Sequence, residues 1–203
     1  MLPKRAGLVI IPLPSSGGLT RADILGLRWQ DINFEAGSVT VSQGRVYLQF
    51  EQDKEKRSIT GNTKSAQRRR EIPVEAVHPG TMDLLEKLKA LQAEERLAAG
   101  NAYNRANEYI VVNELGDPVR PEWYSDQFHR ISKRASVKDI RLHSVRHSLL
   151  FWLHQNGVAP ADAATFLGHT VEVHLSTYLP ASSMSGIARA ALALKEMPRS
   201  DAG

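Results

Sequence analysis

The hydrophobic period of the sequence changes along the chain, and this change restricts the fold class more than any other feature. Thr20 and Asp23 are spaced as in a helical capping box, and the apolar residues that follow predict a helix. Over residues 37–75 the pattern is instead alternating and β-rich, with Gly-containing turns, which predicts a small antiparallel sheet. Helical spacing returns from about Pro79. We therefore expect a mixed α+β fold, mainly α-helical, with a small antiparallel sheet near the N-terminus.

The second half of the chain is predicted to be mostly helical. Apolar periodicity, proline near helix starts and glycine after helix ends predict helices over 121–136, 143–156, 160–167 and 182–195, with a brief strand or extended piece at 109–112. Aromatic residues at helical positions are expected to pack in the core rather than stack on bases: Trp123, Tyr124, Phe151 and Trp152.

Composition limits the function classes. The chain of 203 residues has no cysteine, which excludes disulfides, thiolate catalysis and Cys-based zinc sites. No apolar run approaches the roughly 18 residues of a membrane span, and the run at 8–13 is too short and too proline-rich for a signal peptide. We expect a cytoplasmic protein with no membrane partner. The net charge of +4 favours an anionic partner.

The residues best suited to chemistry lie between Leu142 and Pro180. His143 and Arg146 are three apart on a predicted helix, so both can project from one face. A short helix then leads to His169 in a Leu-Gly-His turn, and Tyr178 follows nine residues later. An arginine fork matches phosphate geometry, and a tyrosine phenol can accept a phosphoryl group covalently.

This order and spacing resemble the signature of the tyrosine recombinase, or phage integrase, family: His-x-x-Arg, then Leu-Gly-His, then tyrosine. Residues 26–32 resemble the segment that links the first catalytic helix to the sheet, and residues 63–73, with Lys64 at their start, resemble the hairpin that presents the catalytic lysine. The resemblance covers about residues 18–195. It implies the tyrosine recombinase catalytic-domain fold over 20–196, preceded by an irregular lead-in at 1–19 and followed by a flexible tail at 197–203.

The resemblance also implies site-specific DNA recombination or integration, by strand cleavage and rejoining through a 3′-phosphotyrosyl intermediate. Tyr178 would attack and Arg146 would clamp the phosphate. Lys64 would protonate the leaving oxygen, and His143 and His169 would assist. No cofactor is required. The expected partner is double-stranded DNA. A homo-tetramer on paired sites is the implied assembly on DNA, with a monomer in isolation as the alternative. A topoisomerase-like relaxing activity would share the same chemistry. The arginine run from Arg68 to Arg70 is equally consistent with a solvated hairpin face and with contact to the DNA backbone, and Arg68 and Arg69 are the candidate DNA contacts.

The match breaks at the first catalytic arginine, whose position holds Thr20. Arg21 is one residue late, about 100° around a helix, and could substitute only if the helix start is re-registered. The family's N-terminal DNA-binding domain also has no counterpart here. The alternative is therefore a truncated, catalytically impaired integrase remnant that acts only as a DNA-binding domain.

A second alternative is a metal hydrolase, because His143 and His147 are spaced as in helical zinc sites. No glutamate lies between them, and Arg146 would place a cation beside the metal. We therefore expect no metal centre.

Overall fold

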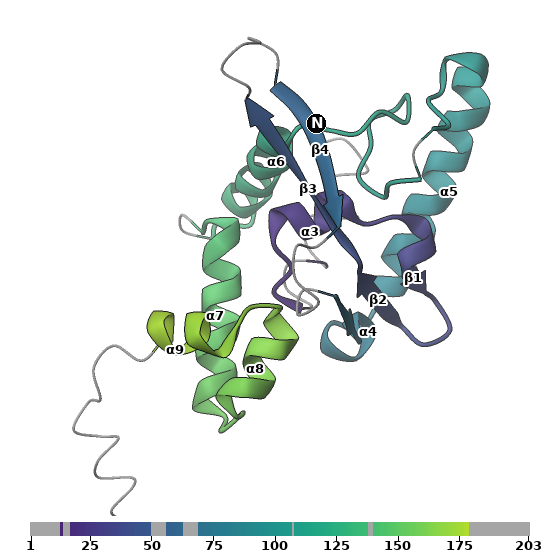
Figure 1. Ribbon diagram of the computed structural model, residues 1–203. Helices are drawn as coiled ribbons and strands as arrows, with labels where there is room; N and C mark the ends of the chain where they lie inside the picture. Colours follow the sequence, from purple (N-terminus) through teal and green to yellow (C-terminus); the bar gives the residue numbers. More distant parts are fainter. Residues whose placement is uncertain are drawn as a thin grey trace, which may run out of the picture.

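The computed structural model describes residues 13, 17–49, 56–62, 69–106, 108–137 and 140–178. Within these ranges, β-structure lies in the middle of the molecule, with a long helix on one side and a group of three helices on the other (Figure 1). The predicted class, mainly helical with a small antiparallel sheet near the N-terminus, is confirmed.

Helix α3 (Arg21–Gly26) begins at a reciprocal cap. The Thr20 hydroxyl accepts from the Asp23 amide at 3.2 Å, and the Asp23 carboxylate accepts from the Thr20 amide at 3.0 Å. The predicted capping box is therefore confirmed. At the other end of the helix, a Cβ on Gly26 would lie 2.8 Å from the Gln43 carbonyl oxygen, so glycine is what allows α3 to pack closely on the adjacent strand.

The β-structure forms two antiparallel sheets. Strands β1 (Ile32–Asn33), β2 (Ser38–Val41) and β5 (Arg70–Ile72) pair in the order β1-β2-β5, with Val39 opposite both Ile32 and Ile72. Strands β3 (Gln43–Gln49) and β4 (Lys56–Asn62) form a separate two-stranded sheet. Short 3₁₀ turns lie at Trp29–Asp31 and Gly100–Ala102.

A hydrophobic core joins the three-stranded sheet to the central helices. It lies between α3, β2, β5, the short helix α4 (Val74–Val77), the long helix α5 (Thr81–Ala99) and α6 (Pro121–Arg134). Leu13 and Leu19 also belong to this core, together with Tyr124, which is fully buried. Burying Leu, Ile and Val side chains contributes roughly 1.5–3 kcal/mol each, so this cluster is the main source of stability.

The C-terminal helices α7 (Leu142–Gln155), α8 (Pro160–Leu167) and α9 (Val171–Tyr178) stand beside this core (Figure 1). Helix α8 ends at Gly168, whose φ of 72° is left-handed, and the Gly168 amide donates to the Ala164 carbonyl at 2.8 Å. This turn brings α9 back against α8.

Several sequence predictions need correction or extension. Of the two alternatives for 109–112, a strand is excluded: the segment forms isolated bridges, Arg28 with Tyr109 and Val112 with Pro118, because its backbone pairs with different neighbours. Phe151 and Trp152 are each 59% exposed, so their predicted core role is wrong; Leu150 is the buried residue of α7. Helix α9 was not predicted. The helix predicted over 182–195 lies outside the described residues, and in the described ranges no helix could cross a membrane.

Candidate active site

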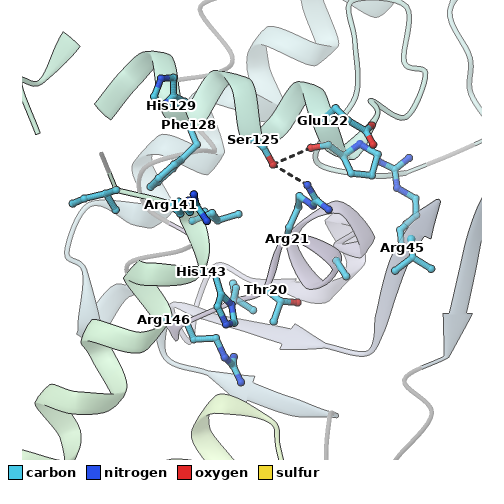
Figure 2. A pocket seen from close by; sticks show the side chains of 16 residues that line it. Thr20, Arg21, Arg45, Glu122, Ser125, Phe128, His129, Arg141, His143 and Arg146 are labelled. Atoms are coloured by element: carbon cyan, nitrogen blue, oxygen red, sulfur yellow. Dashed lines mark hydrogen bonds between the residues drawn. The ribbon is translucent and has the colours of Figure 1, made fainter. Parts of the chain in front are cut away.

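A cavity of about 690 Å³ opens where four elements meet: the start of α3, strand β3, helix α6 and the start of α7 (Figure 2). Three of the predicted site residues line it: Arg21, His143 and Arg146. The fold therefore brings together residues that are more than a hundred positions apart in the sequence.

Thr20 also lines this cavity, but its side chain is used by the helix cap. Because a capping hydroxyl satisfies a backbone amide, the position contributes helix stability and no positive charge. Arg21 supplies the cation of α3 instead. Its Nη1 donates to the Ser125 hydroxyl of α6 at 2.9 Å, and its side chain points across the opening (Figure 2).

Arg146 links the end of the N-terminal segment to the α8–α9 turn. Its Nη1 donates to the Gly18 carbonyl at 2.6 Å, and its Nη2 lies 2.8 Å from the His169 Nδ1. Gly18 has a φ of 58°, and a Cβ there would lie 2.5 Å from the Leu167 side chain. A glycine is thus needed for this segment to approach α7 and α8 closely enough for the Arg146 contact.

His169 sits in a strongly electropositive surrounding. Partial burial, followed by electrostatic interactions with Arg146, His174 and Arg70, lowers its pKa from 6.5 to about 4. Its Nε2 lies 3.2 Å from the His174 Nδ1, and the two rings stack at 5.3 Å between centroids. At neutral pH His169 is therefore an uncharged imidazole.

His143 is exposed at the cavity and packs edge-on against the ring of His147, with centroids 4.4 Å apart. Burial lowers the pKa of His147, and the adjacent His143 and Arg146 lower it further. His143 and Arg146 both lie in the first turns of α7, and both line the cavity.

Arg70 has a role that sequence reasoning missed. Its side chain is buried, makes an ion pair with Asp23 at 3.3 Å and donates through Nε to the Phe166 carbonyl at 2.9 Å. Arg70 is therefore neither part of a solvated face nor in a position to contact DNA, which are the two alternatives for the arginine run. Arg70 instead ties α3 to the end of α8, next to the turn that carries His169. Arg69 is exposed.

Of the remaining predicted residues, the structure describes only the position of Tyr178 in its helix. Tyr178 is the last residue of α9, a helix that begins two residues after His169. Lys64 and Arg68 lie outside the described residues.

Further cations at the cavity were not predicted. Arg141 is the N-cap residue of α7, two positions before His143, and Arg45 comes from β3. The Arg45 guanidinium is buried, donates to the Val119 carbonyl at 2.8 Å and lies over the Tyr109 ring. Among the described residues that line the cavity, Glu122 is the one acid, so the site favours an anion.

No three His, Asp or Glu residues of the described part of the chain come together in a way that could hold a metal ion. His143 and His147 pack on each other beside Arg146. The geometry of the cavity thus favours binding an anionic group through arginine and histidine side chains.

Comparison with known proteins places the chain in a family. The tyrosine recombinase XerC-like protein of Caldanaerobacter subterraneus subsp. tengcongensis is 26% identical over 155 residues, which are 75% of this chain and 40% of that protein. The chain therefore spans well under two thirds of this relative.

Solved structures share the fold. A Tn1549 transposon integrase in complex with circular intermediate DNA has a TM-score of 0.65 at 16% identity, over 93% of this chain and 58% of that chain. A XerH site-specific recombinase bound to its difH substrate has a TM-score of 0.59 at 17% identity, over 97% and 49%. The model of the phage integrase family matches residues 8–183, and the chain belongs to this family.

Proposed function

We propose that this chain is the catalytic domain of a DNA strand transferase that cleaves and rejoins DNA through a 3′-phosphotyrosyl link at Tyr178. The observation that carries the proposal is the placement of Arg146, which lines a cationic cavity with His143 and also contacts His169. Relatives of the same fold were solved bound to DNA. Double-stranded DNA is accordingly the proposed partner, with a homo-tetramer assembling on paired sites.

The scissile phosphate would occupy the cavity. Arg146 has a guanidinium fork that matches phosphate oxygens, and its contacts with Gly18 and His169 fix its orientation in advance. Arg21 and Arg141 add positive charge at the same opening. Since Thr20 serves the cap, Arg21 is the residue through which α3 can contact the phosphate.

The chemistry needs no cofactor. The phenol oxygen of Tyr178 attacks phosphorus while the bond from phosphorus to the 5′ oxygen breaks, and Lys64 supplies the proton that the 5′ oxygen takes up. His143 accepts the phenol proton, and His169 supports the phosphate indirectly, by holding the Arg146 guanidinium in place. The phosphotyrosyl link conserves the energy of the phosphodiester, so the 5′ hydroxyl of another strand can reverse the step. Arg68 and Arg69 would contact the DNA backbone.

Covalent trapping tests this proposal. The protein is incubated at low salt with supercoiled plasmid and with genomic DNA of its source organism, and the reaction is stopped with detergent. We expect a protein–DNA adduct that disappears in Tyr178→Phe and is roughly 10²–10³-fold reduced in Arg146→Ala. Arg96→Ala, an exposed arginine of α5, is the matched control and should leave the yield unchanged. An adduct that persists in Tyr178→Phe would refute the assigned nucleophile.

A second candidate function is DNA binding without cleavage, and one observation favours it. Thr20 is committed to the helix cap, so the first arginine position of the family contributes no cation. Under this reading the protein binds DNA in a salt-sensitive way but forms no adduct. The variant Thr20→Arg separates the two cases: a gain of adduct indicates a recombinase disabled at this position, whereas an adduct already formed by the natural sequence excludes the binding-only function.

A further inference from the structure

His174 occupies a position that the proposed chemistry does not use. It is 2% exposed, lies on α9 four residues before Tyr178, and faces the ring of His169. Because an α-helix has 3.6 residues per turn, His174 lies about one turn before Tyr178, the proposed nucleophile, along α9. The hydrogen bonds of this buried histidine indicate what it does there.

The hydrogen-bond chemistry fixes the protonation of both rings. Arginine has only donor groups, so the His169 Nδ1, 2.8 Å from the Arg146 Nη2, must be an unprotonated acceptor. A neutral imidazole then carries its proton on Nε2. That N–H points at the His174 Nδ1, 3.2 Å away, which must in turn accept. The chain of donation therefore runs one way, from Arg146 to His169 to His174, and both histidines are neutral with the proton on Nε2.

We propose that His174 is a positioning residue, which holds His169 in its donor tautomer and docks α9, and with it Tyr178, against Arg146. The effect of His174 on cleavage rests on the proposed function, whereas the hydrogen-bonded contact itself does not. Acid should break this series of hydrogen bonds, because protonating either acceptor nitrogen places two N–H groups face to face. The surrounding charges agree: Arg146 from α7 and Arg70 from β5 face His169, and His154 from α7 faces His174.

These neighbours set the pH range of the contact. Burial and the nearby cations lower the pKa of His169 to about 4, and burial with His154 lowers that of His174. The hydrogen-bonded chain is thus complete at neutral pH and is lost as the pH falls through these lowered values. We expect any adduct formation to be lost on the acid side in the same way.

The test compares two variants. Asn has an acceptor oxygen close to where the imidazole Nδ1 lies, so His174→Asn should keep the contact without a titrating group. His174→Phe keeps a ring of similar volume and removes the acceptor. Thermal unfolding and circular dichroism of both variants establish that each is folded. His78→Asn, at the end of α4, is the matched control for loss of one histidine.

The deciding measurement is nitrogen-15 NMR of the imidazole side chains in the full chain near neutral pH. We expect His169 and His174 both as Nε2–H tautomers in the natural protein. His174→Phe should lose the slowly exchanging Nε2 proton of His169 and the amide-exchange protection of α9, while His174→Asn and His78→Asn retain both. An Nδ1–H tautomer at either residue, or an unchanged His169 signal in His174→Phe, would overturn the proposal.

This readout is independent of cleavage. If the chain forms no adduct at all, the proposed function fails while the NMR result still decides the role of His174. If it does cleave, adduct formation in His174→Phe should be slower by roughly 10- to 100-fold, with His174→Asn near the natural rate and less sensitive to acid. Equal rates in His174→Phe and the natural protein would contradict a positioning role.

Discussion

Replacing Asp23 by alanine removes the carboxylate that faces the Arg70 guanidinium at 3.3 Å, in a place where each side chain is only 6% exposed. The same carboxylate also accepts from the Thr20 amide at the start of α3. Removing one partner of a buried ion pair costs about 3–5 kcal/mol, because the remaining charge stays desolvated. At about 2–4 °C per kcal/mol for a chain of this size, the melting temperature should fall by roughly 6–20 °C.

Urea unfolding of Asp23→Ala measures this loss. Asp83→Ala is the matched control, since Asp83 lies exposed in the first turn of α5 and should change stability by about 0.5 kcal/mol or less. The double variant Asp23→Leu with Arg70→Met should recover part of the loss, because it leaves no buried charge. A change below about 1 kcal/mol in Asp23→Ala would refute the claim that this pair holds α3 to the α8–α9 turn.

Four other predictions follow from the same geometry. Gly168→Ala should lower the free energy of unfolding by about 1–3 kcal/mol in urea, because φ is 72° and the new Cβ would collide with the Arg70 guanidinium. Thr20→Ala should cost about 1 kcal/mol and Thr20→Ser much less, since serine keeps the cap; equal losses would contradict this. The pKa of His169 is lower in the folded state, about 4 against 6.5, so the unfolded state binds more protons between these values. Stability should therefore fall as the pH drops through this window, and less so in His169→Asn. In a salt titration of DNA binding, Arg141→Ala should reduce the slope of log affinity against log salt by about 1 if this side chain contacts a phosphate.

Local signals in the sequence predicted the elements well. Helix α8 has the boundaries that the proline start indicated, and strand β2 lies within the stretch predicted to be β-rich. The cap of α3 could be predicted from two residues, Thr20 and Asp23. These features depend on backbone chemistry within a few positions, so the sequence alone contains the information. The order of His143, Arg146, His169 and Tyr178 sufficed to indicate the family.

Contacts between distant segments could not be predicted in this way. Arg70 looked like one of three surface arginines, and its burial depends on Asp23, 47 residues away, and on the end of α8, 96 residues away. His174 looked like an ordinary helical histidine, since its partner becomes adjacent only when the α8–α9 turn forms. The core positions predicted for Phe151 and Trp152 were wrong because helical spacing does not say which face of α7 is covered.

Only some of the residues that line the cavity could be predicted from the sequence. Arg21 was considered there only as a re-registered substitute, and the structure explains why it faces the opening: Thr20 is fixed as the cap, and Ser125 receives the Arg21 side chain. Arg141 could have been predicted, because it lies two positions before the His-x-x-Arg pair. The spacing of the family signature does not include it.

Mass spectrometry of the trapped adduct tests the central claim most directly. After nuclease digestion, trypsin should release the fragment from His147 to Arg189, in which Tyr178 is the only tyrosine. Our account predicts that this fragment carries the mass of one or more nucleotides, that fragmentation places the link on Tyr178, and that the modification is absent from Tyr178→Phe. Nucleotides attached to another residue, or a full adduct yield from Tyr178→Phe, would contradict it.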